Sequence, residues 1–485
     1  MYLLQPQLHT RRAFLKRSGQ LALTGTALPL ALNLAAMGEA AAFDATDYKA
    51  LVCVFLYGGN DYANTVVTYD DPSYNLYNSI RGGGVGQTAG GIALAKADLT
   101  ATLLAPTTAP VDVLGQARQY ALHPSMSGLA GLFNAGHAAV QLNVGPLVLP
   151  LTRAQYSSTN RLLYPLPLQL FSHNDQQSIW QSSSPEGSTV GWGGNIGDLA
   201  LSGNGNATFT CMSVTGNAVF LSGDTALQYQ VSTSGAIKIT PATAATVYGS
   251  SAVSGALSSL IRQPRMHKLE NEYNRVTQRA MDAETAVTAA LALTPPSTQF
   301  AADGLAQQLK MVARLIKGQA ALGVKRQVFF VSMGGFDLHD NLIAQQPVLL
   351  DHVSAAMTAF YNATVELGVA NKVTAFTASD FGRTLTSNGD GSDHGWGSHH
   401  LLVGGAVKGK AFYGAPPPVS VGNTAAPQDQ WHVGQGRLLP STAVDQYAAT
   451  LAKWFGVADS ELTGILPNIG HFGGAGYPLN LGFMA

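Results

Sequence analysis

Charged residues are scarce in this chain of 485 residues. Asp, Glu, Lys and Arg together make up 11% of the sequence, against about 25% in an average soluble protein. The formal net charge of -1 excludes the strongly basic surface with which proteins bind nucleic acids or anionic membranes. The surface must therefore consist largely of Ser, Thr, Asn, Gln and Gly, which suits an exported protein.

Cysteine is almost absent, because Cys53 and Cys211 are the only two in the chain. This number excludes a Cys-rich zinc site and a haem-attachment motif. In an oxidising compartment the pair could form one disulfide. Cys53 lies inside an apolar run that is typical of a buried strand, which favours two separately buried thiols.

Long apolar runs and familiar catalytic motifs are missing as well. Beyond the N-terminal region, no segment approaches the roughly 18 to 20 apolar residues that span a bilayer. The sequence contains no H-E-x-x-H motif, no P-loop and no G-x-S-x-G motif. Any functional site must therefore be inferred from where individual residues fall in the predicted fold.

The first 42 residues have the layout of an export signal. Residues 10–16 read TRRAFLK, a twin-arginine pattern, and a stretch of Ala, Leu, Thr and Gly follows over 21–37. Ala40-Ala41-Ala42 then offers an A-x-A cleavage site. A membrane anchor is the alternative, but the stretch is short and weakly apolar. We expect a twin-arginine signal peptide over 1–42, export by the twin-arginine translocase, a periplasmic or secreted mature chain and no stable membrane span.

Short apolar runs rich in β-branched residues recur along the mature chain and are typical of strands buried on both faces. They span residues 51–57, 138–144, 326–333 and 372–378. Between the last two, Leu349, Val353, Met357 and Phe360 form an apolar helical stripe suited to packing on a sheet. This alternation predicts an α/β fold with a doubly wound, mostly parallel sheet flanked by helices.

One region departs from this rhythm. From about 198 to 255 the composition shifts to Ser, Thr, Ala and Gly with short alternating runs. From 257 to 323 the periodicity becomes helical, with a break at Pro295-Pro296. We interpret about 198–323 as an inserted β-rich and helical subdomain, or a lid, within one α/β domain over 43–485.

Three of the predicted strands lead into an aspartate, at Asp61, Asp337 and Asp380. In open α/β sheets, ligands bind just outside the carboxyl ends of the strands. His339 follows Asp337 by two positions, so on an extended segment both side chains share one face. We therefore expect these groups to line one crevice and to hold a divalent metal ion. Polar turns, a solvated loop and a helix N-cap are the alternatives for these positions.

Histidines are concentrated at His394, His399 and His400, three of the 12 in the chain. They lie next to an aspartate and two glycines that permit a close approach of the backbone. Loop histidines with ordinary hydrogen-bond partners are the alternative. The concentration favours a site, and we expect at least one of the three to join the crevice.

Ser172 is the candidate nucleophile, in the segment Phe171-Ser172-His173-Asn174-Asp175. It follows an apolar segment that contains proline. The alternative is the capped start of a helix that continues through residues 176–180.

The ordered set of motifs resembles an exported bacterial family of unknown function, domain of unknown function family 1501. The resemblance covers nearly the whole mature chain. Its motifs are Gly58-Gly59-Asn60-Asp61, Ser172-His173, Phe336-Asp337-Leu338-His339, Ser379-Asp380-Phe381-Gly382-Arg383-Thr384, Asp393-His394-Gly395-Trp396-Gly397 and His399-His400. That family is similar to the superfamily of alkaline phosphatases, sulfatases and cofactor-independent phosphoglycerate mutases. The resemblance implies an alkaline-phosphatase-like α/β fold, two divalent metals and a Ser, Thr or modified Cys nucleophile.

Four positions carry the first part of the resemblance. Asp61 resembles the metal-binding Asp after the first strand, and Ser172 resembles the nucleophile. Asp337 and His339 resemble the Asp and His that share one metal. The superfamily usually spaces that pair as D-x-x-x-H, so the spacing here is shorter.

The last part of the resemblance departs from the two-metal pattern. Asp380 resembles the Asp of an Asp-His dipeptide, but Phe381 stands where that His would be. One of His394, His399 and His400 resembles the late metal-binding His. The resemblance therefore implies one or two divalent ions, with one bound strongly, and the mixed N and O ligands favour Zn, Mn or Fe over Ca.

Two hypotheses about function follow. The first is an exported metal-dependent hydrolase of a phosphate or sulfate ester, acting on a small-molecule substrate, with Ser172 as the nucleophile. The second is a non-catalytic exported protein that keeps the fold and at most one structural metal ion. The altered spacing and Phe381 support the second.

Overall fold

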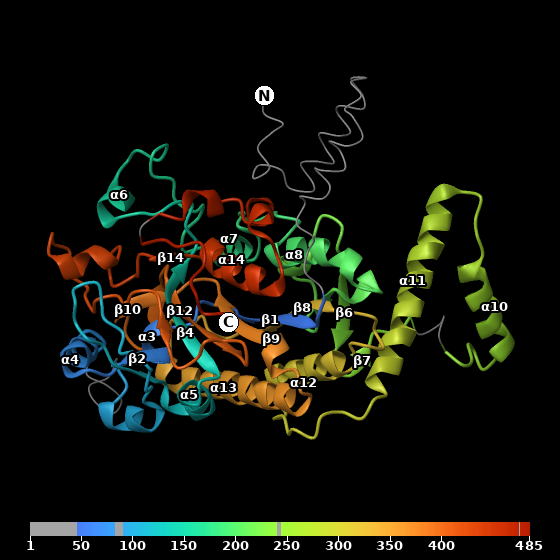
Figure 1. Cartoon of the computed structure of the whole chain (residues 1–485), viewed down its shortest axis with the longest axis horizontal. Coiled ribbons are helices and arrows are strands. Elements are labelled where there is room, and N and C mark those ends of the chain that lie inside the picture. Colours follow the sequence, from blue (N-terminus) through green and yellow to red (C-terminus); the bar gives the residue numbers. More distant parts are fainter. Residues whose placement is uncertain (1–45, 83–90, 240–243, 475) are drawn as a thin grey trace.

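The computed structural model describes residues 46–82, 91–239, 244–474 and 476–485 (Figure 1). The signal peptide predicted over 1–42 lies outside the described residues. Within the described ranges, no helix combines the length and the apolar character needed to cross a membrane.

A ten-stranded mixed sheet forms the centre of the molecule (Figure 1). Its strands are β1 (Lys49–Leu56), β4 (Ala138–Gly145), β5 (Cys211–Ser213), β6 (Gln228–Ser232), β7 (Gly235–Ala236), β8 (Arg326–Met333), β9 (Val373–Ser379), β12 (Ser398–Gly404), β13 (Phe412–Tyr413) and β14 (Thr442–Ala443). The order is β13-β4-β12-β9-β1-β8-β5-β6-β7, and β14 also pairs with β4. All neighbours from β9 to β6 are parallel, whereas β12 runs antiparallel to β9 and β4. The predicted mostly parallel α/β sheet is confirmed.

Helices cover both faces of the sheet. On one face lie α5 (Ser127–Asn134), α12 (Gly304–Lys317) and α13 (Leu342–Glu366), and on the other lie α7 (His173–Ser182), α8 (Trp192–Ala200) and α14 (Val444–Phe455) (Figure 1). Because successive side chains of a strand point to opposite faces, Val52 and Val54 belong to the core on the α12 and α13 face, while Phe55 belongs to the core on the α8 and α14 face. This two-sided cover explains why the predicted strands are continuous apolar runs rather than alternating ones.

The predicted helical stripe between the last two of those runs is confirmed in α13. Val353, Met357 and Phe360 are buried in the core cluster that lies against the sheet, and Leu349 packs against this cluster. The stripe therefore anchors the helix that joins β8 to β9.

The two cysteines are free and buried. Cys53 on β1 stands opposite Phe330, and Cys211 on β5 stands opposite Val328. Because β8 runs between them, the two thiols lie on different strands with no direct pairing.

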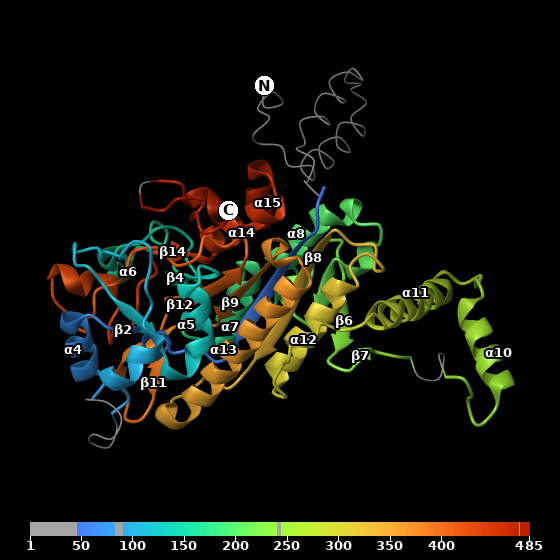
Figure 2. The same ribbon diagram turned by 60° about the horizontal axis from the view of Figure 1, so that its bottom comes forward.

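The region predicted as an insertion, about 198–323, divides into two parts. Strands β5 and β6 extend the parallel sheet, and α12 packs on it. Helices α10 (Ser251–Arg262) and α11 (Lys268–Leu291) form an arm that extends from the body (Figures 1 and 2).

Smaller elements complete the molecule around the ends of the sheet. They are α3 (Tyr62–Thr65), α4 (Asp71–Ile80), α6 (Arg153–Ser157) and α15 (Leu462–Ile465), together with the ribbon of β2 (Val66–Thr68) and β3 (Tyr120–Leu122) and the ribbon of β10 (Arg383–Ser387) and β11 (Ser392–His394).

Three parallel strands end side by side, which places the segments that follow them at one edge of the sheet. Leu56, the last residue of β1, pairs with Met333 at the end of β8 and with Ser379 at the end of β9. Gly58 lets these segments pack closely, because a Cβ there would lie 2.3 Å from the backbone nitrogen of Asp337. Its φ of 115° is also one that L side chains rarely adopt.

Candidate metal centre

Asp337 lies at the centre of a cluster of nitrogen atoms. Its Oδ1 is 3.2 Å from His394 Nε2 and 3.1 Å from His339 Nε2, and it accepts a hydrogen bond from Arg383 Nη1 at 2.9 Å. Its Oδ2 is 3.4 Å from His173 Nε2. The carboxylate is 45% exposed, so the centre opens to solvent. A small molecule can therefore reach it.

The charge of Asp337 is stabilised by its surroundings. Burial raises the pKa of its carboxyl, but the hydrogen bond and the charge of Arg383 outweigh burial, with further help from His173 and His339. The pKa is therefore held below its usual range, and the group is an anion at neutral pH.

The backbone orients His394. Its Nδ1 lies 2.7 Å from the carbonyl oxygen of Phe171. A carbonyl can only accept a hydrogen bond, so Nδ1 carries the proton and Nε2 presents its lone pair towards Asp337. Burial also lowers the pKa of His394, which favours the neutral ring that a metal needs.

Carboxylates orient the other two rings. His173 Nδ1 lies 2.7 Å from Asp380 Oδ2, and His339 Nδ1 lies 3.2 Å from Asp393 Oδ1. In both rings the second nitrogen, Nε2, faces Asp337. A metal-binding histidine usually has its far nitrogen held by such an acceptor. The hydrogen bond to Asp380 also raises the pKa of His173.

Asp380, predicted as a metal ligand, lies behind His173 instead. Its side chain is fully buried, and its Oδ2 accepts hydrogen bonds from the backbone nitrogen of Gly58 at 3.1 Å and from Gln177 Nε2 at 2.8 Å. The same oxygen holds His173. Asp380 therefore positions a ligand through Oδ2, while its buried Oδ1 has no hydrogen-bond partner in the described structure.

The donor atoms fit a divalent metal ion. One donor atom each from His173, Asp337 and His394 lie within 4.8 Å of one another. His173 Nε2 is buried without a hydrogen-bond partner in the described structure, and such an orphaned atom calls for an explanation. Two imidazoles and one carboxylate match the ligand set of catalytic zinc sites, which keep a further position open.

Asp61 does not join the cluster, although it was expected to bind metal. Its Oδ2 accepts hydrogen bonds from Arg81 Nη2 at 2.7 Å and from Ser392 Oγ at 2.6 Å. Its Oδ1 caps α3 by accepting from the backbone nitrogen of Asn64 at 3.0 Å. The carboxylate is 2% exposed, and both its oxygens are taken by protein groups.

His399 and His400 also lie away from the cluster, because they belong to the buried strand β12. His399 Nδ1 accepts a hydrogen bond from the backbone nitrogen of Asn143 at 3.1 Å, and His400 packs edge-on against Trp180. Burial lowers the pKa of each ring to about 3. Both are therefore neutral core residues, and only His394 of the three reaches the centre.

Ser172 precedes the first residue of α7, between two residues of the site. Its Oγ donates a hydrogen bond to Asp175 Oδ2 at 2.9 Å. Phe171 on one side accepts from His394 and has a φ of 76°, a strained value for a bulky residue. On the other side, His173 faces Asp337.

His173 was missed as a ligand by sequence reasoning, which singled out the neighbouring serine. The sequence feature that could have indicated His173 as a ligand is the Ser-His pair at the start of a helix. Phe381, which stands where a second metal's histidine was expected, is 1% exposed. Its ring packs 4.9 Å from that of His173 and 4.6 Å from that of His394. An apolar ring that offers no ligand atom therefore occupies the space beside the cluster.

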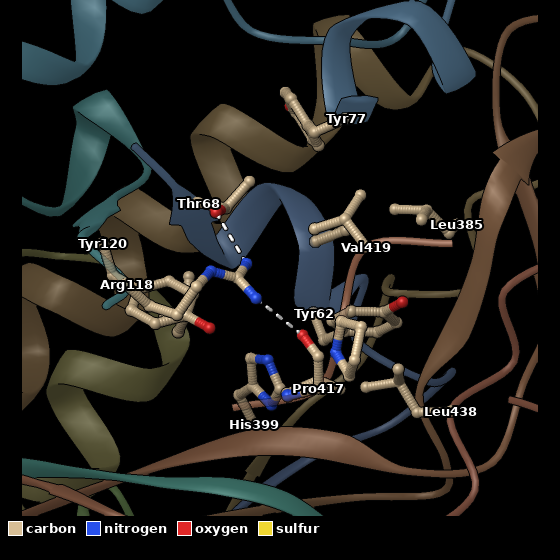
Figure 3. Close-up of a pocket in the computed structure, with 13 residues that line it drawn as sticks. Tyr62, Thr68, Tyr77, Arg118, Tyr120, Leu385, His399, Pro417, Val419 and Leu438 are labelled. Atoms are coloured by element: carbon tan, nitrogen blue, oxygen red, sulfur yellow. Dashed lines mark hydrogen bonds between the residues drawn. The ribbon is translucent and has the colours of Figure 1, made fainter. Parts of the chain in front are cut away.

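A small pocket lies apart from the residues of the cluster, none of which lines it (Figure 3). Tyr62, His399 and Arg118 line it, and Arg118 donates hydrogen bonds to Thr68 Oγ1 at 2.9 Å and to the carbonyl oxygen of Pro417 at 3.0 Å (Figure 3). Its volume of about 30 Å³ has room for one or two water molecules.

Among solved structures, matches to this chain are at low identity and low TM-score. The structure of Ps i-CgsB in complex with k-i-k-neocarrahexaose shares 9% identity and a TM-score of 0.31, over 87% of this chain and 77% of that chain. A structure named BT33494S-sulf, described with the metabolism of multiple glycosaminoglycans by Bacteroides thetaiotaomicron, shares 11% identity and a TM-score of 0.30, over 85% and 74%.

No curated protein matches the sequence. The family described as "Protein of unknown function (DUF1501)" matches residues 48–465, which include every residue of the cluster. The chain belongs to the DUF1501 family.

Proposed function

We propose that this protein is an exported metal-dependent hydrolase of a phosphate or sulfate ester. One observation carries the proposal: the Nε2 atoms of His173, His339 and His394 converge on Asp337, and each ring is held from behind at Nδ1. Such orientation of several rings towards one point has no use in a solvated loop. It is what a metal centre requires.

His173, Asp337 and His394 would hold the ion, with His339 beside them. The nitrogen and carboxylate donors favour Zn, Mn or Fe over Ca. The ion would supply Lewis acidity towards an ester oxygen. Because Phe381 removes one nitrogen ligand, we expect one strongly bound ion in each chain.

Ser172 and Asp175 would supply the nucleophile and its base. The hydroxyl of Ser172 already donates to Asp175 Oδ2 at 2.9 Å, which is the reach that general-base catalysis requires. The carboxylate would take the hydroxyl proton as the serine oxygen attacks phosphorus or sulfur, and the bond to the ester oxygen would break. The alcohol would leave with a proton from solvent, and water would then hydrolyse the serine ester.

Ser172→Ala is expected to lower kcat for 4-nitrophenyl phosphate or sulfate by about 100-fold or more, because general-base and nucleophilic catalysis contribute on this scale. The ion content should not change. Ser178→Ala is the matched control. Ser178 lies in α7, and its hydroxyl donates to the carbonyl oxygen of Pro185 and not to a residue of the cluster. Full activity of Ser172→Ala would show that Ser172 is not the nucleophile and only precedes α7.

A non-catalytic role with one structural ion is the second candidate. The close packing of Phe381 against the rings of His173 and His394 favours it, because a two-metal centre needs that space. A bound ion together with no hydrolysis across a broad panel of phosphate and sulfate esters would select this candidate.

We also propose export by the twin-arginine translocase, supported by the pattern at Arg11-Arg12 and the apolar stretch after it. Replacing both arginines with lysine is expected to retain the protein in the cytoplasm, as measured by immunoblotting of cell fractions. An unchanged periplasmic amount would contradict the twin-arginine route.

A further inference from the structure

Arg437 is held beside the cluster by two contacts. Its Nε donates a hydrogen bond to the carbonyl oxygen of His394 at 2.6 Å. Its guanidinium lies over the ring of Phe171, 5.3 Å from the ring centroid, in a cation–π arrangement. The same Phe171 accepts from His394 Nδ1 and precedes Ser172. The cation is thus tied to a metal-ligand candidate and to the nucleophile segment.

The outer nitrogens of Arg437 remain available. Only its Nε has a hydrogen-bond partner within the described ranges, and no described carboxylate lies within ion-pair distance of its guanidinium. Arg383, the other arginine of the site, differs. Its donors are engaged by Asp337, by the carbonyl oxygen of Gly58 and by Ser392.

A half-buried cation with no acid in contact is an unusual arrangement. Burial lowers the pKa of Arg437, and the charge of Asp393 partly opposes this change. A guanidinium nevertheless stays protonated in proteins. The outer nitrogens of Arg437 are not among the buried, unpartnered atoms of the described structure, so they reach solvent and an anion can approach them.

We infer that Arg437 binds the anionic phosphate or sulfate group of the substrate beside His394. Its paired outer N–H groups match two oxygens of a tetrahedral oxyanion. The inference rests on the proposed function and narrows the substrate class. Monoesters that carry negative charge would gain this contact, and neutral carboxylic esters would not.

Binding of inorganic phosphate and of inorganic sulfate to the zinc-loaded mature chain, measured by isothermal titration calorimetry, tests this inference. Arg437→Met keeps an unbranched apolar stem against Phe171 but removes the charge. We expect its Kd for phosphate to rise about 10- to 100-fold, the range for charged hydrogen bonds. Arg437→Lys should fall between Arg437→Met and the wild type, because an ammonium restores charge without the paired donors. Arg275→Met, at an exposed position on the α11 arm, should bind as the wild type does.

Zinc content and unfolding temperature separate anion binding from a structural role. Both should be unchanged in Arg437→Met, because Arg437 touches His394 only at its backbone carbonyl and the methionine stem can still pack against Phe171. Unaltered phosphate affinity in this variant, loss of zinc from it, or a wild type that binds neither anion would overturn the inference.

The inference and the proposed function fail in different ways. Arg437-dependent phosphate binding by a protein that hydrolyses no ester would support the anion site and remove the hydrolase. Hydrolysis of a phosphate monoester by Arg437→Met with the KM of the wild type would keep the hydrolase and remove the anion site.

Discussion

Asp337→Ala is expected to lower the affinity of the protein for its divalent ion by about 100-fold or more. Loss of an outer-shell partner of a metal ligand alone costs 10- to 100-fold, and Asp337 is the anion on which all three rings converge. Wild-type protein purified without chelator should contain about one ion per chain, and the variant should contain little.

Elemental analysis and competition with a chromophoric chelator measure this change. Asp340→Ala is the matched control, because Asp340 lies in the same segment, is exposed and has no hydrogen bond or ion pair in the described structure. Asp337→Asn separates charge from packing, since its amide oxygen can still accept from Arg383. Wild-type ion content in Asp337→Ala would rule out the cluster as the metal centre.

The sequence predicted which residues lie at the carboxyl edge of the sheet, and the reason is physical. A strand buried on both faces must be a continuous apolar run, and parallel strands of similar length end together. Asp337 therefore could be placed at a strand end and His339 beside it before any coordinates. His394 was placed only as one of three, because nothing local distinguishes it from His399 and His400.

What the sequence could not predict depends on partners that are distant in the chain. The strand β12, which buries His399 and His400, begins with polar residues, so its start carries no apolar run that would predict a strand. His173 reaches the centre from a helix on a different segment, and only the folded chain brings it to Asp380, 207 positions away. Its local pattern is the same as that of any capped helix.

Asp61 is a residue that the sequence predicted as a metal ligand but that distant partners turn into a structural residue. A Gly-flanked Asp after a strand favours a metal ligand, but the role of the carboxylate depends on what lies opposite it. Here Arg81 and Ser392 fill that position. The Arg81 guanidinium is fully buried, and the carbonyl oxygens of Thr384 and Leu385 are its other acceptors.

Asp61→Asn is therefore expected to lower the free energy of unfolding by about 3 to 5 kcal/mol, the cost of leaving a buried charge without its partner. Asn keeps the shape of the side chain and the oxygen that caps α3, so the change removes the ion pair and the acceptor for Ser392 but leaves the cap in place. Urea denaturation of the mature chain measures it.

Asp71→Asn provides the comparison, because Asp71 pairs with Lys96 at the surface and is 85% exposed. Its loss should change the free energy of unfolding by less than about 1 kcal/mol.

The ion content of Asp61→Asn should equal that of the wild type, since Asp61 faces Arg81 and not the cluster. A variant that keeps its stability and loses its ion would instead assign Asp61 to the metal, as the family resemblance implied. Asp61 should therefore govern folding with little effect on the ion, whereas Asp337 should govern ion binding.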